Sequence, residues 1–176
     1  MTSSQPAPLV YSDDFIREIL QTTKTIAMVG ASDNPARPSW IAFKYLQQRG
    51  FRMFPVNPVL AGKDILGARV HATLADVSEP IDMVDIFRNS AAAGGIVDEA
   101  LALRPLPKVI WMQLSVRDDE AAARATAAGL AVVMNRCPKI EYGRLTGEIG
   151  WTGVNSRRLS SKRSAMMSGF QKRSLT

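Results

Sequence analysis

Short hydrophobic runs alternate along this chain with longer segments in which apolar positions recur every three or four residues. The short runs are rich in Val, Ile, Met and Phe and predict buried strands at residues 25–29, 51–56, 82–87, 108–113 and 130–134. The longer segments predict helices at residues 39–49, 90–103 and 117–128. Because strands that alternate with helices form βαβ units, we expect an α/β fold. The expected sheet is doubly wound, parallel and five-stranded, in the order 3-2-1-4-5, with helices on both faces.

Polar residues and glycines mark the expected helix ends. Ser12 is the expected N-cap of a short additional helix, and Ser39 that of the helix over 39–49. Gly50 and Gly129 stand where two of the helices should stop. We divide the chain into an N-terminal arm (1–11), one domain (12–143) and a basic C-terminal extension (144–176), whose end is expected to be flexible.

Length and composition place the chain with soluble, single-domain proteins. It has 176 residues and no apolar run near the ~20 residues that cross a bilayer, so no membrane association is expected. The first residues lack the charged start and apolar centre of a signal peptide. A single cysteine, Cys137, excludes an internal disulfide and suits a reducing, cytoplasmic location.

The net charge of +6 is concentrated at one end of the chain. Basic and acidic residues balance over 1–143, whereas residues 144–176 hold seven basic residues against Glu148 alone. A basic tail can contact nucleic acid, and this alternative stays open. No aromatic stacking pattern accompanies the charge, so we favour a solvated end and regard nucleic acid as a less favoured partner.

The segment that follows the first expected strand has the character of a phosphate-binding loop. Gly30 permits a tight turn, and the backbone N–H groups of residues 31–34 can face a phosphate at the start of the next helix. Ser32 adds a hydroxyl donor and Arg37 a positive charge. A plain turn between a strand and a helix remains the alternative. A valine in place of Gly30 is expected to block the ligand without disturbing the fold.

The end of the second expected strand narrows the class of nucleotide. An NAD site favours an acidic residue there, but the strand ends at Val56 and continues into Asn57 and Pro58. Lys63 follows a few residues later. Loss of the acid and gain of a cation suit a ribose that carries a phosphate, as in NADP or coenzyme A. The loop lacks the second and third glycines of the dinucleotide fingerprint, which weighs against NADP.

Five stretches together resemble a known family. They are VGASDNPARPSW, PVNPVLAGKDILG, DMVDIFRNS, VIWMQLSVRDDEAA and VVMNRCPKIEYGRL, within residues 12–163. In this order and spacing they resemble the CoA-binding-domain proteins, small stand-alone relatives of the N-terminal domain of the succinyl-CoA synthetase α-subunit. The resemblance implies a Rossmann-like fold that holds coenzyme A or an acyl-CoA. The synthetase's phosphorylated histidine lies in a domain that has no counterpart here, so ligase chemistry does not carry over.

The resemblance also implies which residues contact the ligand. The loop after the first strand would hold the CoA phosphates, and Gly62-Lys63 matches a Gly-Lys pair that meets CoA in the relatives. The ends of the third and fourth strands would line the rest of the pocket. The expected ligand-binding residues are Gly30, Ala31, Ser32, Asp33, Asn34, Arg37, Ser39, Asn57, Pro58, Gly62, Lys63, Ile86, Phe87, Arg88, Trp111, Met112 and Gln113.

Several residues keep two interpretations. Trp111 and Phe87 suit either the core or a wall that stacks on adenine. Asp82 and Asp85 lie three apart in one strand, hence on opposite faces, which favours structural roles. Cys137 is either a buried thiol or, beside Arg136, a thiol of lowered pKa that forms a disulfide with the ligand.

No catalytic or metal-binding residue is assigned. The one histidine, His71, matches nothing catalytic and is expected at the surface or on an edge strand. We expect a CoA-binding protein without a reaction of its own. The alternatives are a small enzyme that acts on an acyl-CoA or uses NADP, and a nucleic-acid-associated protein. A homo-oligomer or a protein partner stays open.

Overall fold

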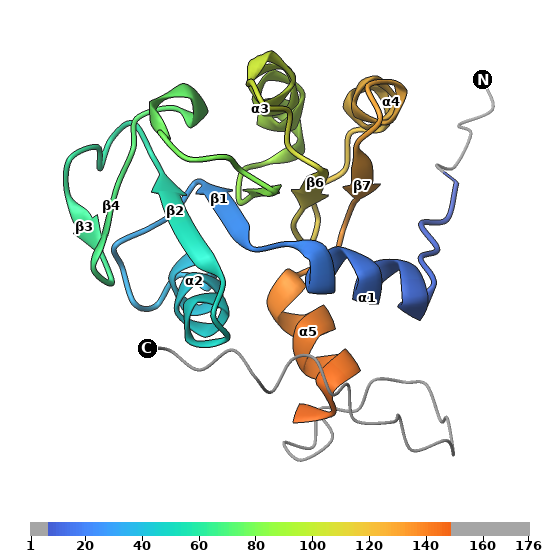
Figure 1. Cartoon of the computed structure of the whole chain (residues 1–176), viewed down its shortest axis with the longest axis horizontal. Helices are drawn as coiled ribbons and strands as arrows, with labels where there is room; N and C mark the ends of the chain where they lie inside the picture. The colour runs from blue at the N-terminus through green and yellow to red at the C-terminus, as the bar shows by residue number, and fades with distance from the viewer. Residues whose placement is uncertain (1–6, 149–176) are drawn as a thin grey trace.

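A computed structural model describes residues 7–148 and confirms a Rossmann-like α/β fold. Five parallel strands form one sheet in the order β2-β1-β5-β6-β7, with helices on both faces (Figure 1). The strands are β1 (Thr25–Val29), β2 (Arg52–Val56), β5 (Met83–Ile86), β6 (Val109–Met112) and β7 (Ala131–Val133). Each coincides, within a residue or two at either end, with one of the five hydrophobic runs.

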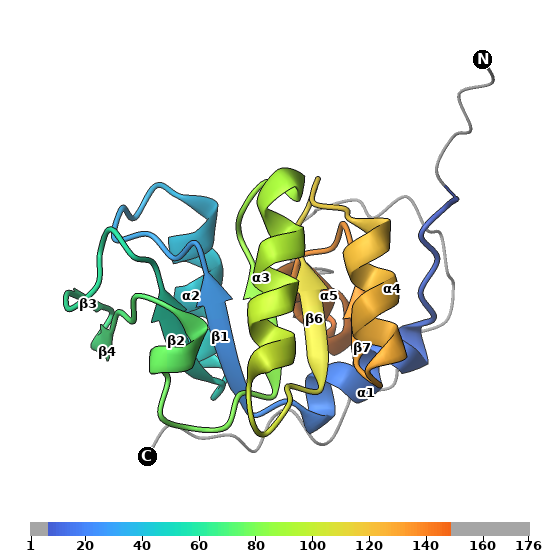
Figure 2. The ribbon, with the colours of Figure 1, turned by 90° about the horizontal axis from the view of Figure 1, so that it is seen from above.

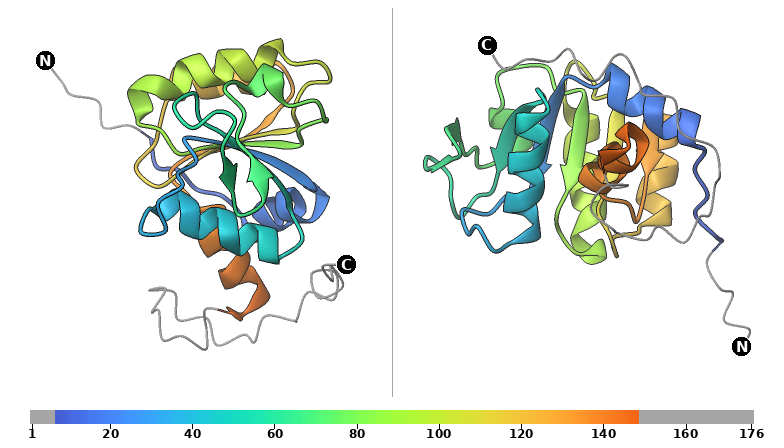
Figure 3. Two further views of the ribbon diagram at one scale, coloured as in Figure 1. Left: turned by 90° about the vertical axis from the view of Figure 1, so that its left-hand side faces the viewer. Right: turned by 90° about the horizontal axis from the view of Figure 1, so that it is seen from below.

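The helices divide between the two faces of the sheet. One face carries α1 (Asp13–Thr22), α2 (Pro38–Gln48) and α5 (Pro138–Thr146). The other carries α3 (Ser90–Ala102), α4 (Asp119–Ala127) and the short 3-10 helix η1 (Leu74–Asp76). Figures 2 and 3 show the two helical layers with the sheet between them. Among the described residues, no helix is long and apolar enough to span a bilayer.

The strand order depends on how one isolated bridge is counted. His71 pairs in parallel with Val56 at the outer edge of β2. If the bridge at His71 is counted as a strand, it is the third along the chain and lies outside β2. The sheet from this bridge through β2, β1 and β5 to β6 then has the expected order 3-2-1-4-5, and β7 is a sixth strand beside β6. The segment expected to be the third strand, 82–87, is therefore β5, which lies beside β1 in the middle of the sheet. The bridge supports the expectation that His71 lies on an edge.

The strands β3 (Asp64–Ile65) and β4 (Ala68–Arg69), the 3-10 helix η1 and the helix α5 were absent from the prediction. A small antiparallel hairpin joins β3 to β4 at the edge of the molecule beyond β2. The helix α5 runs to Thr146, so it crosses the expected boundary between the domain and the extension at residue 143. The expected flexible end of the extension lies outside the described residues.

One of the two expected N-caps is confirmed and the other is wrong. The Ser12 hydroxyl accepts the Phe15 N–H at 3.2 Å, which makes Ser12 the N-cap of α1. The helix α2 instead begins at Pro38, because the fixed φ of proline suits the first helical position. Its N-cap is therefore Arg37, and Ser39 lies buried inside the first turn.

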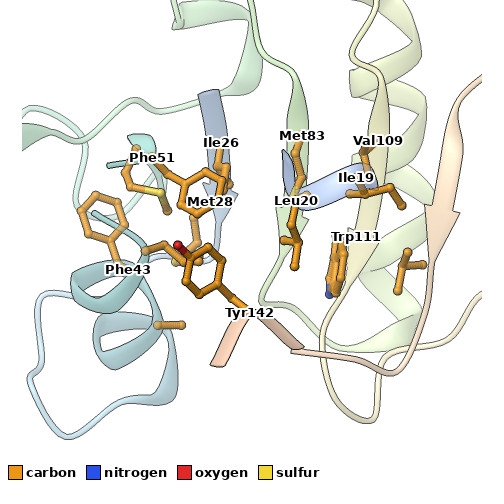
Figure 4. Close-up of a cluster of buried hydrophobic side chains, with 14 of the residues drawn as sticks. Ile19, Leu20, Ile26, Met28, Phe43, Phe51, Met83, Val109, Trp111 and Tyr142 are labelled. Atoms are coloured by element: carbon orange, nitrogen blue, oxygen red, sulfur yellow. The ribbon is translucent and has the colours of Figure 1, made fainter. Parts of the chain in front are cut away.

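The core on the α1–α2–α5 side explains why α5 belongs to the domain. Tyr142 of α5 packs edge-on against Phe51, with ring centroids 5.9 Å apart, among the buried side chains drawn in Figure 4. Arg144 of the same helix pairs with Asp13 of α1 at 2.9 Å. The helices α1 and α5 thus pack against each other and on the same face of the sheet.

Candidate functional site

Gly30 lies where the carboxyl ends of β1, β2 and β5 meet. Its φ is +89°, and its N–H donates to the Val56 carbonyl at 2.9 Å. A Cβ at this position would lie 2.4 Å from the Phe87 carbonyl oxygen. Glycine is therefore required for both its conformation and this close approach. The expectation that valine leaves the fold undisturbed is corrected, because such a side chain would collide with backbone.

The loop after Gly30 is held in shape by its own polar side chains. Ser32 Oγ accepts the Asn34 N–H at 3.1 Å, and Asn34 Oδ1 accepts the Ala36 N–H at 2.9 Å. The Asn57 side chain, from the segment after β2, donates to the Ala31 carbonyl at 2.8 Å. The N–H of Asn34 is thus engaged within the loop, which leaves fewer donors for a phosphate than the sequence suggested.

Lys63 lies next to this loop although thirty positions separate it from Asp33 in the sequence. Its Nζ is 3.9 Å from Asp33 Oδ2, and the two side chains are 63% and 49% exposed. Backbone bonds from Gly62 N–H to the Val70 carbonyl (2.9 Å) and from Val70 N–H to the Lys63 carbonyl (2.8 Å) hold the residue in place. An ion pair as exposed as this one contributes little to stability. The Lys63 ammonium therefore remains able to pair with an anion.

The strand ends divide the expected pocket residues into two groups. Phe87, Arg88 and Gln113 come just after β5 and β6 and line a pocket. Ile86, Trp111 and Met112 are the last strand residues and are fully buried in the core. The Trp111 indole N–H donates to the Arg136 carbonyl at 2.8 Å, which fixes the ring beneath α5. These three side chains have no exposed surface with which to meet a ligand.

The remaining expected residues lie around the loop. Arg37 and Pro58 are solvent-exposed, and Asn57 binds the loop backbone as described above. Ser39 is buried under the first turn of α2. Only Arg37 and Pro58 of these thus have open access to a ligand.

The pocket has a volume of about 930 Å³ and lies beside the Gly30 loop. Its walls come from the first turns of α2 and α5 and from the segments after β5 and β6. The lining residues are Pro38, Ile41, Ala42, Phe87, Arg88, Asn89, Ser90, Gln113, Leu114, Ser115, Val116, Cys137, Lys139 and Ile140. The apolar members Ile41, Leu114 and Ile140 were not expected, because helical and loop positions of this kind look like ordinary core or surface in the sequence.

Asp85 is a fully buried carboxyl beneath the pocket lining. Its Oδ1 accepts the Gln113 side-chain N–H at 2.8 Å, and its Oδ2 has no hydrogen-bond partner among the described residues. Burial raises the pKa of Asp85 to about 7, and the Gln113 hydrogen bond opposes part of that rise. Asp82, at the other end of the strand, binds the backbone N–H groups of Lys24 and Thr25.

Cys137 is buried at the start of α5 and lines the same pocket. Burial raises the pKa of its thiol, and the charge of Asp85 acts in the same direction. The structure therefore favours the buried thiol over a reactive thiolate. Among residues 7–148, no cluster of three or more His, Cys, Asp or Glu side chains is suited to a metal ion.

Comparisons with known proteins identify the family to which the chain belongs. A model of the CoA binding domain family matches residues 24–143. The protein YneT of Bacillus subtilis is 35% identical over 127 residues, which cover 72% of this chain and 91% of YneT. A solved Thermus thermophilus structure is 37% identical with a TM-score of 0.72, over 76% of this chain and 98% of that one.

A larger enzyme shares the fold alone. The dinucleotide-forming acetyl-coenzyme A synthetase 1 of Ca. Korarchaeum cryptofilum is 23% identical with a TM-score of 0.55, over 66% of this chain and 27% of that one. The fold defines the class as a Rossmann-like α/β domain. Within that class, the chain belongs to the CoA binding domain family.

Proposed function

We propose that this protein binds coenzyme A or an acyl-CoA at the carboxyl edge of its sheet and catalyses no reaction on it. Family membership supports CoA binding in general. The position of the ligand is argued from the loop after β1, where the ligand's phosphates would meet the N-terminal end of α2.

The observation that carries this proposal is the placement of Lys63 beside the loop. Its ammonium lies 3.9 Å from Asp33, while the rest of its contacts leave the side chain largely in solvent. Arg88 is a second cationic residue near the loop, since its Cδ would lie 3.0 Å from a Cβ at Gly30. Two cationic residues near one glycine turn suit a ligand with several phosphates.

The absence of catalysis is argued from the positions of the candidate groups. Thioester hydrolysis needs a nucleophile or water beside a base. Cys137 is held as the thiol at the start of α5, whereas His71 lies at the outer edge of β2. Saturable release of free thiol from a panel of acyl-CoAs, lost in Cys137→Ser or His71→Ala, would instead support the alternative of a small enzyme.

Calorimetry on Lys63→Ala tests the site. We expect this variant to lose more affinity for CoA than for dephospho-CoA, because only CoA carries the 3′-phosphate that a ribose-side cation would meet. A charged hydrogen bond of this kind is worth about 1.5–3 kcal/mol.

Lys108→Ala is the matched control for this experiment. Lys108 is equally exposed, at 64%, and is also ion-paired, but lies at the opposite end of the sheet beside Asp82. Affinity for both ligands should be unchanged in this control. Equal losses of affinity for CoA and dephospho-CoA in Lys63→Ala would show that Lys63 does not contact the 3′-phosphate. No loss of affinity for either ligand would show that the ligand does not bind at this edge of the sheet.

A further inference from the structure

Three large apolar side chains in the lining of the pocket beside the loop are exposed to solvent. Ile41 of α2, Leu114 after β6 and Ile140 of α5 are 43%, 53% and 41% exposed. All three line this one pocket, although they come from three separate segments of the chain. Single exposed apolar side chains are ordinary, but a group that converges on one concave site is typical of an apolar ligand.

The pocket is continuous with the proposed phosphate site. Phe87 and Arg88 are the residues nearest to the position of a Cβ at Gly30, and both also line the pocket. A ligand whose phosphates lie on the Gly30 loop therefore has the pocket as its nearest enclosed space. The volume of about 930 Å³ exceeds what a small polar group would fill.

The inner lining offers a neutral polar group rather than a charge. Gln113 donates one side-chain N–H to Asp85 at 2.8 Å, which orients the amide. An amide nitrogen carries two N–H donors, so the second can serve a carbonyl oxygen. Cys137 beside it is held as the thiol and adds no charge. This chemistry suits a thioester or amide carbonyl followed by an apolar chain.

We infer that the pocket lined by Ile41, Leu114 and Ile140 binds the pantetheine arm together with an aliphatic acyl group, so that the preferred ligand is an aliphatic acyl-CoA rather than free CoA. This inference rests on the proposed function, because it needs the phosphates on the Gly30 loop. Arg88 and Lys139 are the charged members of the lining, and Lys139 also lies 5.7 Å from the ring centroid of Tyr45.

Calorimetry with CoA, hexanoyl-CoA, decanoyl-CoA and succinyl-CoA on the full chain tests the inference. Burial of one methylene tightens binding by up to about fourfold. We therefore expect hexanoyl-CoA to bind at least tenfold more tightly than CoA. Succinyl-CoA, whose acyl group ends in a carboxylate, should gain less than hexanoyl-CoA.

Two variants and one matched control identify the surface responsible. Ile41→Gln and Leu114→Gln make the pocket polar without a change of charge, and the ratio of hexanoyl-CoA to CoA affinity should fall toward one. Leu106→Gln makes the same exchange at an exposed leucine that does not line this pocket, and the ratio should stay at its original value.

The outcomes separate this inference from the proposed function. Equal affinities for CoA and hexanoyl-CoA, a ratio that survives both pocket variants, or tighter binding of succinyl-CoA than of hexanoyl-CoA would each overturn the inference while CoA binding stands. A chain that binds none of the four ligands would overturn the proposed function as well.

Discussion

At the scale of single residues, Gly30 and Gly129 share a left-handed conformation but differ in their surroundings. Their φ values are +89° and +90°. A Cβ at Gly129 would meet nothing within 4 Å, whereas one at Gly30 would meet the Phe87 carbonyl at 2.4 Å. Glycine is therefore required at position 30 by both its positive φ and its neighbours, and at position 129 by its positive φ alone.

This difference predicts the effect of alanine at each position. Gly129→Ala should lower the free energy of unfolding by about 1–2 kcal/mol, the penalty for a side chain in the left-handed region. Gly30→Ala should lose about 1–3 kcal/mol more, because the loop must move away from β5. Urea denaturation of both variants measures this difference. Equal losses would mean that the loop yields freely and that the contact with Phe87 is unimportant.

Asp85 predicts an unusual dependence of stability on pH. Its folded pKa of about 7 lies above the ordinary value of 3.8, so the folded state retains a proton that the unfolded state has released between these values. Stability should therefore fall as pH rises from about 4 to 7, by on the order of 4 kcal/mol from this group alone. The loss should be complete above the folded pKa.

Asp85→Asn should flatten this part of the pH profile. Urea denaturation at pH 5 and pH 8 measures the slope in both proteins. Asp82→Asn is the control: against the effect of burial, which they outweigh, hydrogen bonds from Lys108 and from the backbone N–H groups of Lys24 and Thr25 lower the pKa of Asp82, so its stabilising contribution is lost only at pH values below the ordinary carboxyl range. Asp82→Asn should therefore leave the change in stability between pH 5 and pH 8 as it is in the wild type. A wild-type profile that rises between pH 5 and 8 and is unaffected by Asp85→Asn would contradict the account of Asp85.

At the scale of elements, α5 shows where the sequence pattern stops being informative. The strands are continuous hydrophobic runs, the longer helices have helical periodicity, and both were predicted almost to their ends. The segment of α5 begins with Pro138 and has Gly143 in its interior, so it lacks a clear helical signal although tertiary packing forms the helix. The strands β3 and β4 have two residues each, too few for any alternation to register.

The candidate site was predictable only in part. Gly30 and Lys63 were assigned from loop chemistry and from the family resemblance, and the fold brings them to one edge. Ile86, Trp111 and Met112 are fully buried, which the sequence did not reveal, because a hydrophobic run does not show which of its residues is the last one covered by helices. The side chains that reach the pocket come one or two positions later, as Gln113 and Leu114 do.

The packing of α5 predicts a large loss of stability for Tyr142→Ala. The ring is almost fully buried and lies edge-on to Tyr45 and Phe51, with centroids 6.0 Å and 5.9 Å away. Removal of a buried aromatic ring lowers the free energy of unfolding by about 3–5 kcal/mol. Ile140→Ala on the same helix removes an exposed side chain and should change it by only about 0.5 kcal/mol. Similar losses for the two variants in urea denaturation would mean that α5 does not pack as described.

At the scale of the whole molecule, residues 7–148 contain the five strands of the parallel sheet, the Gly30 loop, Lys63 and the pocket residues described above. Glu148 is anchored to the domain, since the Arg49 guanidinium pairs with it at 2.7 Å. The whole excess of basic residues lies beyond it, because residues 1–148 hold equal numbers of basic and acidic residues.

A chain of residues 1–148 should therefore keep its melting temperature and its CoA affinity. Thermal denaturation and calorimetry beside the full chain measure both. A marked loss of affinity would assign part of the site to residues 149–176. Binding of a DNA or RNA oligonucleotide by the full chain, absent in residues 1–148, would support the alternative of a nucleic-acid-associated protein.

The measurement that tests the central claim most directly is amide hydrogen exchange of the full chain with and without CoA. The account predicts that CoA slows exchange at 30–37, 57–63 and 87–90, the segments that meet at the carboxyl edge of the sheet. Exchange at 78–82 and 103–108, at the opposite edge, should not change. Protection confined to that opposite edge, or no protection of the carboxyl-edge segments at saturating CoA, would contradict the proposed site.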